Sequence, residues 1–408
     1  MWYLWKLQIQ VALASLLAFF LLPFAPIPLD FHPVAYNVTL PEFTGRLTIN
    51  KDLHRAKMLF QQKLNGPESL AIKDGMIYTG TQLGDVYRID PIKETLTKVT
   101  NTGSDCEGLF EEEKCGRVLG LRFAPNGDLY AADAYKGLLK IDINTGKVET
   151  LVANGEYVGT SKLLFPNDLD IDDNGIIYYS QASTRWGLHQ LTYIVMEHDT
   201  TGRILTYDTK TKKSGILQDN LAFPNGVQIS DDRTALLFSE LANKRILKYQ
   251  LKGADKGKLT EFTTSLPGGP DNLRLNEHGT YWVAIDGARS VTLPHISDLI
   301  APYPLIAKAT MRFCWLVGEG LERVNSYLNN PTIKATSADF KNGKVLLKLL
   351  PERGIVVEVI ETGEILRGLH STNFTFFSEV LEHEGYLYIG SFIAPYLLRV
   401  PNPPFLGD

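Results

Sequence analysis

A unit of roughly fifty residues recurs along this chain, and it constrains the fold more than any other sequence feature. Each copy has a short apolar strand, a second strand mixing aliphatic and aromatic residues, a third strand ending near an acid and a polar fourth strand. The second strands lie at Gly75–Tyr78, Gly127–Tyr130, Gly175–Tyr178, Leu236–Phe238, Gly279–Trp282 and Gly385–Tyr388. Such a sheet can bury its two faces only by stacking on neighbouring sheets. The sequence therefore predicts an all-β fold, a six-bladed β-propeller.

The repeat also indicates where the ring closes and where it is interrupted. Strand-like residues 58–64, before the first copy, are candidates for completing the last blade, which would tie the two ends of the chain together. Between Ser290 and Thr336 the strand pattern gives way to one or two helices inserted in the fifth blade. This insert is either a cap over one face of the ring or a packed or membrane-facing helical hairpin. We expect the propeller to span residues 53–408, after a linker at 31–52.

The first thirty residues predict a membrane anchor. Residues 7–29 have no charged side chain and residues 11–22 are apolar apart from Ser15, so the stretch is long enough to cross a bilayer. Lys6 precedes this stretch and Asp30 follows it, which leaves the N-terminus in the cytoplasm. We expect a single-pass type II protein in the plasma membrane or endoplasmic reticulum, with residues 1–30 as cytoplasmic stub and transmembrane helix. A cleaved signal peptide is the alternative, and either would place the propeller outside the cell or in the lumen.

Further features agree with an oxidising compartment. Cys106 and Cys115 lie nine positions apart, so a disulfide between them can close a hairpin loop, and Cys314 is left unpaired. A zinc site is disfavoured because no second Cys or His pair has ligand spacing. Asn37 and Asn373 begin Asn-x-Thr sequons and are candidate N-glycosylation sites. The net charge of -5 comes from mixed acids and bases without a long basic cluster, which argues against nucleic acid as a partner.

Short motifs containing proline stand at the start of several repeats, at Gly66–Glu68, Phe165–Asp168, Phe223–Gly226 and Gly269–Asn272. Because the innermost strand of each blade lines the axis, equivalent positions far apart in sequence converge there. The side chains that would converge are Glu68, Asn167, Asn225, Asp271 and Asn272. They offer only carboxylate and amide oxygens, which a hard cation such as calcium prefers. Such motifs also form plain turns, but polar groups facing a narrow axis must be paired or ligated, so the set predicts a metal site.

A series of motifs runs in order from Gly66 to the C-terminus: GPES, CGRVLGL, STRW, GRILTYD, LAFPNGVQIS, PGGPDNLR, YWVA and SEVLEHEGYLYIGSF. Together they resemble the strictosidine-synthase-like propellers, which are related to paraoxonases and senescence marker protein-30. The resemblance implies six blades, hydrolysis of aryl esters or lactones, and calcium as the metal. It also places the family's metal-binding Glu, two Asn and Asp-Asn pair on Glu68, Asn167, Asn225, Asp271 and Asn272.

Two departures from the family patterns bear on the reaction. Paraoxonases have a catalytic His near the CGRVLGL segment, where this chain has Val118 and Leu119. Strictosidine synthase uses a Glu of its sixth blade as base, and the comparable segment here offers Ser378 or Glu379. The resemblance therefore implies the metal site more firmly than it implies either of these two mechanisms.

We expect a calcium-dependent hydrolase of a small ester or lactone substrate. Asp271 is the expected carboxylate that activates water or attacks the carbonyl directly. Two alternatives stay open: a non-catalytic, membrane-tethered interaction module with a structural metal, and an enzyme that condenses an amine with an aldehyde. The sequence assigns no protein partner.

Overall fold

The computed structural model describes residues 2–404, apart from the side chains at positions 2–4, 7 and 9. The predicted domain limits at residues 1 and 408 lie outside the described residues. Internal contacts divide the chain into two units. The helical unit consists of the residues up to Thr39 with His189–Asp199 and His295–Leu350, and the sheet unit consists of Leu40–Leu188, Thr200–Pro294 and the residues from Pro351 onward. The two units do not follow the predicted domain boundaries near residues 30 and 52, because each unit combines segments that are distant in sequence.

The described residues of the sheet unit form six four-stranded antiparallel sheets. The first two are β2 (Leu70–Lys73), β3 (Met76–Gly80), β4 (Asp85–Asp90) and β5 (Thr95–Asn101), then β6 (Val118–Phe123), β7 (Leu129–Asp133), β8 (Gly137–Ile141) and β9 (Val148–Ala153). The next two are β12 (Pro166–Ile171), β13 (Ile176–Gln181), β14 (Gly202–Asp208) and β15 (Lys213–Leu221), then β16 (Pro224–Ile229), β17 (Ala235–Glu240), β18 (Arg245–Gln250) and β19 (Leu259–Thr263).

The fifth sheet is β20 (Gly269–Leu275), β21 (Tyr281–Asp286), β22 (Gly354–Val359) and β23 (Ile365–Ser371). The sixth is β24 (Phe377–His383), β25 (Tyr386–Ser391) and β26 (Leu397–Pro401), completed by β1 (Lys57–Leu59). A short extra pair, β10 (Tyr157–Val158) and β11 (Ser161–Lys162), and a one-turn helix, α2 (Glu112–Cys115), decorate the loops.

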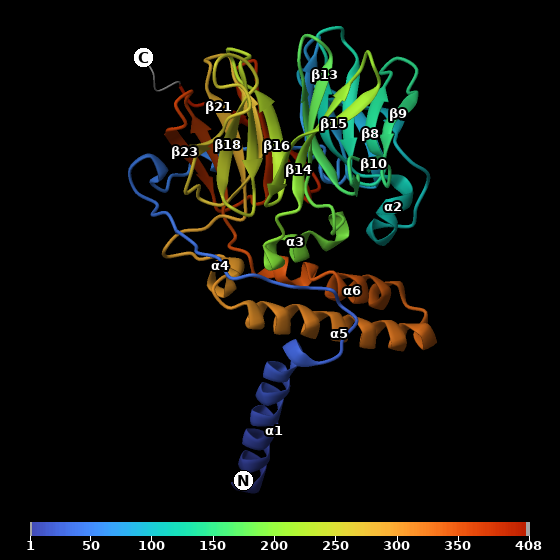
Figure 1. Ribbon diagram of the computed structural model, residues 1–408, viewed down its shortest axis with the longest axis vertical. Coiled ribbons are helices and arrows are strands. Elements are labelled where there is room, and N and C mark those ends of the chain that lie inside the picture. The colour runs from blue at the N-terminus through green and yellow to red at the C-terminus, as the bar shows by residue number, and fades with distance from the viewer. Residues whose placement is uncertain (1, 405–408) are drawn as a thin grey trace. The chain divides into compact units, whose positions relative to one another are not determined.

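The sheets form a closed cycle. The first strand of each sheet contacts the first strand of the next, from β2 through β6, β12, β16 and β20 to β24, and β24 in turn contacts β2. This is the arrangement of a β-propeller, and Figure 1 shows the sheets standing side by side. The predicted closure is confirmed by Met58 and Leu59 of β1, which pair with Leu398 and Leu397 of β26, but the strand ends at Leu59 and residues 60–64 form bends and turns. Both ends of the sheet unit thus share one sheet.

Burial falls from the first strand of a sheet to the fourth. β12 is buried along its whole length, whereas most residues of β15 are exposed or half-buried. Apolar clusters join neighbouring sheets: Ala71 and Tyr78 of the first sheet pack with Val118 and Leu121 of the second. Because neighbouring sheets cover both faces of the inner strands, any polar side chain that these strands carry is removed from water.

The helical unit is assembled from three stretches of chain. They contribute α1 (Trp2–Leu21), then α3 (Leu191–Glu197), and finally α4 (Ile296–Ile300), α5 (Pro304–Leu328) and α6 (Pro331–Lys341). The last three helices lie between β21 and β22, so the predicted helical insert in the fifth sheet is confirmed, and it extends beyond Thr336 to a 3-10 helix at Lys344–Leu349. The sequence pattern predicts no helix at α3, because its seven residues are too few to show a helical period.

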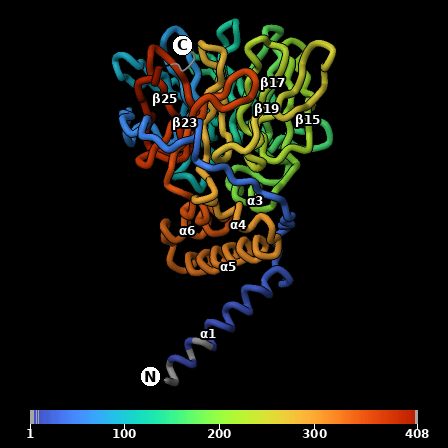
Figure 2. The backbone as a smooth tube through the Cα atoms, turned by 90° about the vertical axis from the view of Figure 1, so that its left-hand side faces the viewer, coloured from blue at the N-terminus to red at the C-terminus, as the bar shows by residue number. Residues whose placement is uncertain are grey.

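Helices α5 and α6 lie side by side, as Figures 1 and 2 show. The Ser337 hydroxyl of α6 donates a hydrogen bond to the carbonyl of Gly318 at 2.9 Å. A Cβ atom on Gly318 would lie 2.8 Å from the carbonyl oxygen of Ser337, so only glycine permits the two backbones to come this close.

The segment predicted to anchor the chain forms α1, a helix of 20 residues. Within the described residues, no helix is both long and apolar enough to cross a membrane. The predicted disulfide between Cys106 and Cys115 is confirmed, and Cys314 is free and buried. Asn37 and Asn373 are both exposed, as an N-glycosylation site requires.

The sixth sheet provides a test of ring closure. Leu59 is 2% exposed and packs in the sixth sheet's core, whereas its neighbour Met58 is 40% exposed. Leu59→Ala should lower the free energy of unfolding by about 2–3 kcal/mol because it leaves a cavity where the ends of the ring meet. Met58→Ala is the matched control and should change stability by less than about 0.5 kcal/mol. Urea denaturation followed by tryptophan fluorescence measures both; equal effects would mean that β1 does not hold the ring closed.

Candidate functional site

Most of the predicted ligands lie at irregularities of the innermost strands. In the third, fourth and fifth sheets the pairing of the first strand with the second shifts register after a proline, at Pro166, Pro224 and Pro270. The residues inside these bulges are Asn167, Asp168, Asn225, Gly226, Asp271 and Asn272. Glu68 occupies the corresponding place just before β2. A bulge releases a residue from the strand ladder and redirects its side chain, which is why bulges are common beside functional sites.

The five predicted ligands share an unusual state: each is buried, yet each keeps one oxygen without a hydrogen-bond partner. All are exposed by 3% or less. The oxygens without a partner among the described residues are Oε2 of Glu68 and Oδ1 of Asn167, Asn225, Asp271 and Asn272. Leaving one such group unpaired costs about 1–3 kcal/mol. Oxygens of four sheets in this state at equivalent positions form a set that a bound cation would satisfy.

Serine hydroxyls fix the backbone at three of these positions. Each serine belongs to the sheet that precedes the ligand's own sheet, so each bond sets the register of two neighbours. The bonds run from Ser180 to the carbonyl of Asn225 at 2.5 Å, from Ser239 to that of Asp271 at 2.9 Å and from Ser378 to that of Glu68 at 2.8 Å. Ser378, one of the two residues compared with the base position of strictosidine synthase, thus donates to the backbone of Glu68.

A buried network of charges that the sequence analysis missed lies beside the predicted ligands. Arg274 of β20 donates to the two carboxylate oxygens of Asp168 in β12 at 2.8 and 2.9 Å. The same guanidinium donates to Oε2 of Glu379 in β24 at 2.6 Å and contacts its Oε1. The Ser69 hydroxyl donates to Glu379 as well, at 3.0 Å. These four buried residues come from four different sheets and hold their inner strands together.

The sequence did contain a signal for this network, namely charged residues inside otherwise apolar inner strands. Asp168 stands in PNDLDI, Arg274 in GPDNLRL and Glu379 in FSEVLEH. Only Glu379 was considered, as a candidate base. Because Arg274 contacts both of its carboxylate oxygens, Glu379 is a partner in an ion pair rather than a free proton acceptor.

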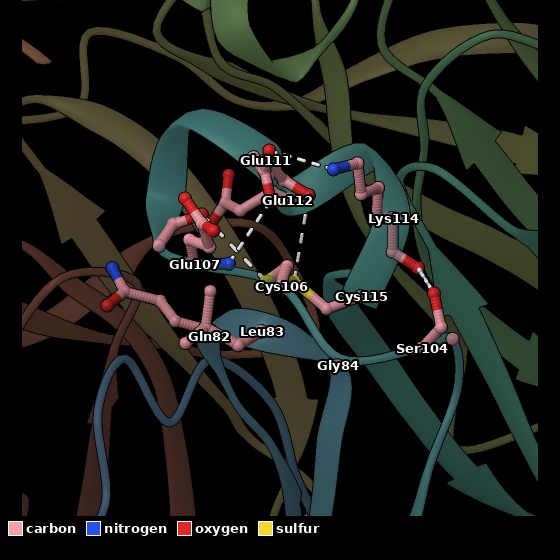
Figure 3. The surroundings of a disulfide bond; sticks show 12 residues. Gln82, Leu83, Gly84, Ser104, Cys106, Glu107, Glu111, Glu112, Lys114 and Cys115 are labelled. Carbon is pink, nitrogen blue, oxygen red and sulfur yellow. Dashed lines mark hydrogen bonds and ion pairs between the residues drawn. A yellow bond between two sulfur atoms is a disulfide. The ribbon is translucent and has the colours of Figure 1, made fainter. Parts of the chain in front are cut away.

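Arg117 connects Glu68 with the disulfide loop. Its Nη2 lies 3.9 Å from Oε2 of Glu68, which is close enough for an ion pair but too long for a hydrogen bond. Its Nη1 lies 3.3 Å from Oε1 of Glu112 in α2, and its backbone N–H donates to Asp133. Figure 3 shows the disulfide of Cys115 next to Glu112 on this small helix. The disulfide loop thus presents a second carboxylate to the guanidinium that faces Glu68.

Burial perturbs the acids near the predicted site. It raises the pKa of Glu68 from 4.5 to about 8, with Arg117 opposing the shift and the charges of Asp286 and Glu379 adding to it. Burial, followed by the charge of Glu68, raises the pKa of Asp271 well above its usual value. Burial also raises the pKa of Asp286 to about 6. These carboxyl groups are close enough to repel one another when ionised, and a divalent cation would offset that repulsion.

The donor set agrees with calcium in its chemistry, since it consists of carboxylate and amide oxygens. Only Glu68 and Asp271 among the five are acids, and the remaining three are amides. In the part of the chain that the structure describes, no group of three or more His, Cys, Asp or Glu side chains could hold a metal ion. The assignment of calcium to these residues stays a prediction.

The position at which paraoxonases have a catalytic His is apolar here. Val118 and Leu119 stand where β6 shifts register against β7, in a bulge like those of the ligands, and both are buried. A separate cavity of about 480 Å³ lies at the outer strand of the fifth sheet. Its lining includes Asn50, Arg367 and Gly368 and no predicted ligand.

The chain is similar in sequence to two family patterns and to several known proteins. The strictosidine synthase family pattern matches residues 167–254, and the pattern of the N-terminal part of strictosidine synthase-like proteins matches residues 45–89. Adipocyte plasma membrane-associated protein from Salmo salar is 35% identical over 395 residues, covering 95% of this chain and 87% of that protein. The protein of the same name from Gallus gallus is 35% identical over 378 residues, covering 91% of this chain and 84% of that protein.

Solved structures with the same fold have much lower sequence identity. A gluconolactonase from Xanthomonas campestris superposes with a TM-score of 0.55 at 14% identity, over 92% of this chain and 99% of that one. A luciferin-regenerating enzyme gives 0.52 at 13% identity, over 84% of this chain and 92% of that one. The calcium-binding protein regucalcin from Agrobacterium tumefaciens gives 0.50 at 11% identity, with the same coverage. At these identities the similarity shows the fold alone.

The network around Arg274 generates a stability prediction. Arg274→Gln should lower the free energy of unfolding by about 3–5 kcal/mol, because it removes the guanidinium that donates to both buried carboxylates and leaves Arg122 as the positive charge acting on Asp168 and Glu379. The matched control is Arg233→Gln, which breaks an exposed pair with Asp173 and should cost about 0–1 kcal/mol. Chemical denaturation measures both variants. A small effect of Arg274→Gln would show that the network does not hold the inner strands together.

The raised pKa of Glu68 predicts how stability depends on pH. Between pH 4.5 and about 8 the folded carboxyl keeps a proton that the unfolded chain releases, so without a divalent cation stability should fall as pH rises through this range. Added calcium should oppose this loss most strongly at the alkaline end, because it replaces the proton. Thermal melts with chelator and with calcium measure the effect.

Two variants control the pH experiment. Glu68→Gln should flatten the pH dependence in chelator and weaken the response to calcium. Asp173→Asn, which removes an exposed carboxylate, should change neither. A calcium response that is equal at all pH values would contradict the prediction.

Proposed function

Because the chain belongs to the family of adipocyte plasma membrane-associated proteins, we propose that it is a membrane-tethered, calcium-dependent hydrolase of small esters or lactones. The observation that carries the proposal is the set of five buried oxygens without a hydrogen-bond partner among the described residues, four at equivalent positions of four sheets and the fifth on Asn272, next to Asp271. The fold shared with a gluconolactonase and with a calcium-binding regucalcin supports the same reading. We further propose that the six sheets are the blades of a six-bladed propeller.

In this proposal Glu68, Asn167, Asn225, Asp271 and Asn272 hold the ion. A bound calcium ion would polarise the carbonyl of an ester or lactone and stabilise the negative charge that develops on its oxygen. Asp271 is the proposed catalytic carboxylate: it accepts a proton from water, or attacks the carbonyl carbon itself. The amides of the three Asn residues orient the substrate carbonyl.

The tether is proposed to be the N-terminal segment, in the single-pass type II arrangement with the sheet unit outside the cell or in the lumen. The support is the uncharged stretch at residues 7–29, the disulfide between Cys106 and Cys115, and the relatives named for the plasma membrane. Glycosylation of the exposed Asn37 and Asn373 would follow from this topology.

A second candidate function is a membrane-tethered interaction module with a structural cation. The observation that favours it is the burial of every predicted ligand to 3% exposure or less, which leaves a substrate little access. Val118 and Leu119 in the segment compared with the catalytic His of paraoxonases also favour the interaction module. Amine–aldehyde condensation would need Glu379 as its base, and both oxygens of that carboxylate contact Arg274.

Hydrolysis of phenyl acetate and of a simple lactone by the full-length protein in detergent separates these candidates. The hydrolase should be active with calcium, lose activity with chelator, and lose about 100-fold or more in kcat/KM in Asp271→Asn. Asp173→Asn should keep full activity because this exposed carboxylate lies outside the predicted site.

The two candidates differ in one combination of results. A chelator that lowers the melting temperature while no ester or lactone is turned over would support the interaction module. Turnover that withstands both chelation and Asp271→Asn would remove the proposed site from the reaction.

A further inference from the structure

Helix α5 of the helical unit exposes a stripe of apolar side chains to solvent. Its exposed apolar residues include Phe313, Leu316, Val324 and Tyr327, which together with Gly320 recur at intervals of three and four residues and so lie along one side of the helix. Phe313 is 50% exposed and Tyr327 is 89% exposed. An apolar stripe of this length on the surface marks a site of interaction with an apolar partner.

The other side of α5 is covered within the helical unit. Gly318 packs on Ser337 of α6, and Glu319 and Glu322 form ion pairs with Lys341 of α6. On a helix of 3.6 residues per turn, Gly318 and Glu322 lie on the side away from Leu316 and Tyr327. Helix α5 therefore turns Gly318, Glu319 and Glu322 toward α6, and on its other side the apolar residues of the stripe keep much of their surface exposed.

The apolar side of α5 is fixed to the end of α1. The guanidinium of the buried Arg312 donates to the carbonyl oxygens of Leu22, Pro23 and Ala25, at 2.8, 3.0 and 2.8 Å, just after α1 ends. Phe19 of α1 packs edge-on against Phe313 of the stripe, with ring centroids 6.5 Å apart. Figures 1 and 2 both show α5 lying across the C-terminal end of α1, with α6 on its far side. Helix α1 thus leaves from the side of α5 that carries the stripe.

Helix α1 indicates what the stripe would meet. Lys6, Gln8 and Gln10 are exposed near its start, and from Val11 to Leu21 its exposed residues are apolar apart from Ser15. A helix of 20 residues is about 30 Å long, which matches the thickness of a bilayer's hydrocarbon core. If α1 stands across a bilayer, a helix fixed crosswise at its end lies parallel to the membrane surface. Arg323, exposed one turn before Tyr327 of the stripe, would then face the lipid headgroups.

We propose that α5 is an interfacial membrane helix whose stripe of Phe313, Leu316, Val324 and Tyr327 is immersed at the boundary between headgroups and acyl chains, next to the anchor α1. The proposal rests on the proposed anchoring by the N-terminal segment but not on hydrolysis. Such a helix adds apolar contact area to a single tether and fixes the orientation of the helical unit on the bilayer, so that this unit does not hang freely from its anchor.

Site-specific labelling of the full-length protein in liposomes tests the proposal. In a Cys314→Ala background, an environment-sensitive fluorophore is attached at Leu316→Cys, or at Glu322→Cys as the matched control on the side of α5 that faces α6. Emission should shift to the blue at position 316, and lipids with a spin label near the headgroup end of the acyl chain should quench it. The label at position 322 should show neither effect.

A second label at Tyr327→Cys guards against local damage by the first and should behave like position 316. Flotation with the liposomes reports anchoring separately. Protein that floats with liposomes while labels 316 and 327 stay unquenched would overturn the interfacial role of α5 and leave the anchor intact. A blue shift without quenching by lipid would mean that a second copy of the chain covers the stripe. Failure to float would overturn both the anchor and the proposal.

Discussion

Closing six sheets into a cycle moves the first strand of every sheet away from water, and the rest of the sheet unit follows from how the polar side chains on those strands are satisfied. At one set of positions the protein supplies the partners itself: Arg274 donates to Asp168 and Glu379, the charge of Arg122 also acts on both, and Ser69 donates to Glu379. At the neighbouring positions the hydrogen bonding is incomplete, because one side-chain oxygen of each predicted ligand has no hydrogen-bond partner among the described residues. The ion-pair network around Arg274 thus lies next to the predicted ligands, whose oxygens lack partners. Its hydrogen bonds hold the inner strands that carry these ligands.

The bulges explain how the two networks stay separate. Each extra residue after a proline allows adjacent residues such as Asn167 and Asp168 to serve different purposes, the first as a predicted ligand and the second in the ion-pair network. The serine hydroxyls of neighbouring sheets then hold the bulged backbone in register. In the second sheet the same irregularity carries Leu119, so that sheet offers no oxygen side chain at this position. The side chain at this bulge can therefore differ between sheets while the strand pairing stays the same.

The helical unit contains both segments for which contact with a membrane is proposed, α1 and α5. Its longest helix, α5, keeps its polar side for α6 and leaves its apolar side where α1 departs. The buried guanidinium of Arg312 donates hydrogen bonds to carbonyl oxygens just after α1 ends. These charge-assisted bonds fix the end of α1 to α5. The proposed tether and the proposed interfacial helix thus belong to one unit.

The sequence by itself determined the repeat, the closure by residues 58–64, the helical insert and the disulfide, because each depends on local pattern or on spacing along the chain. It also singled out Glu68, Asn167, Asn225, Asp271 and Asn272 as inward-facing oxygens, since a repeat places equivalent residues equivalently. Only the tertiary structure decided that Arg274 binds Asp168 and Glu379, which are more than a hundred positions away, and that Glu379 is therefore not a free base. The helical unit likewise joins three separate stretches of chain. Contacts between residues so far apart in sequence produce no periodic sequence pattern. The closure of the ring decides which charged side chains meet, and the neighbouring residues in the sequence do not.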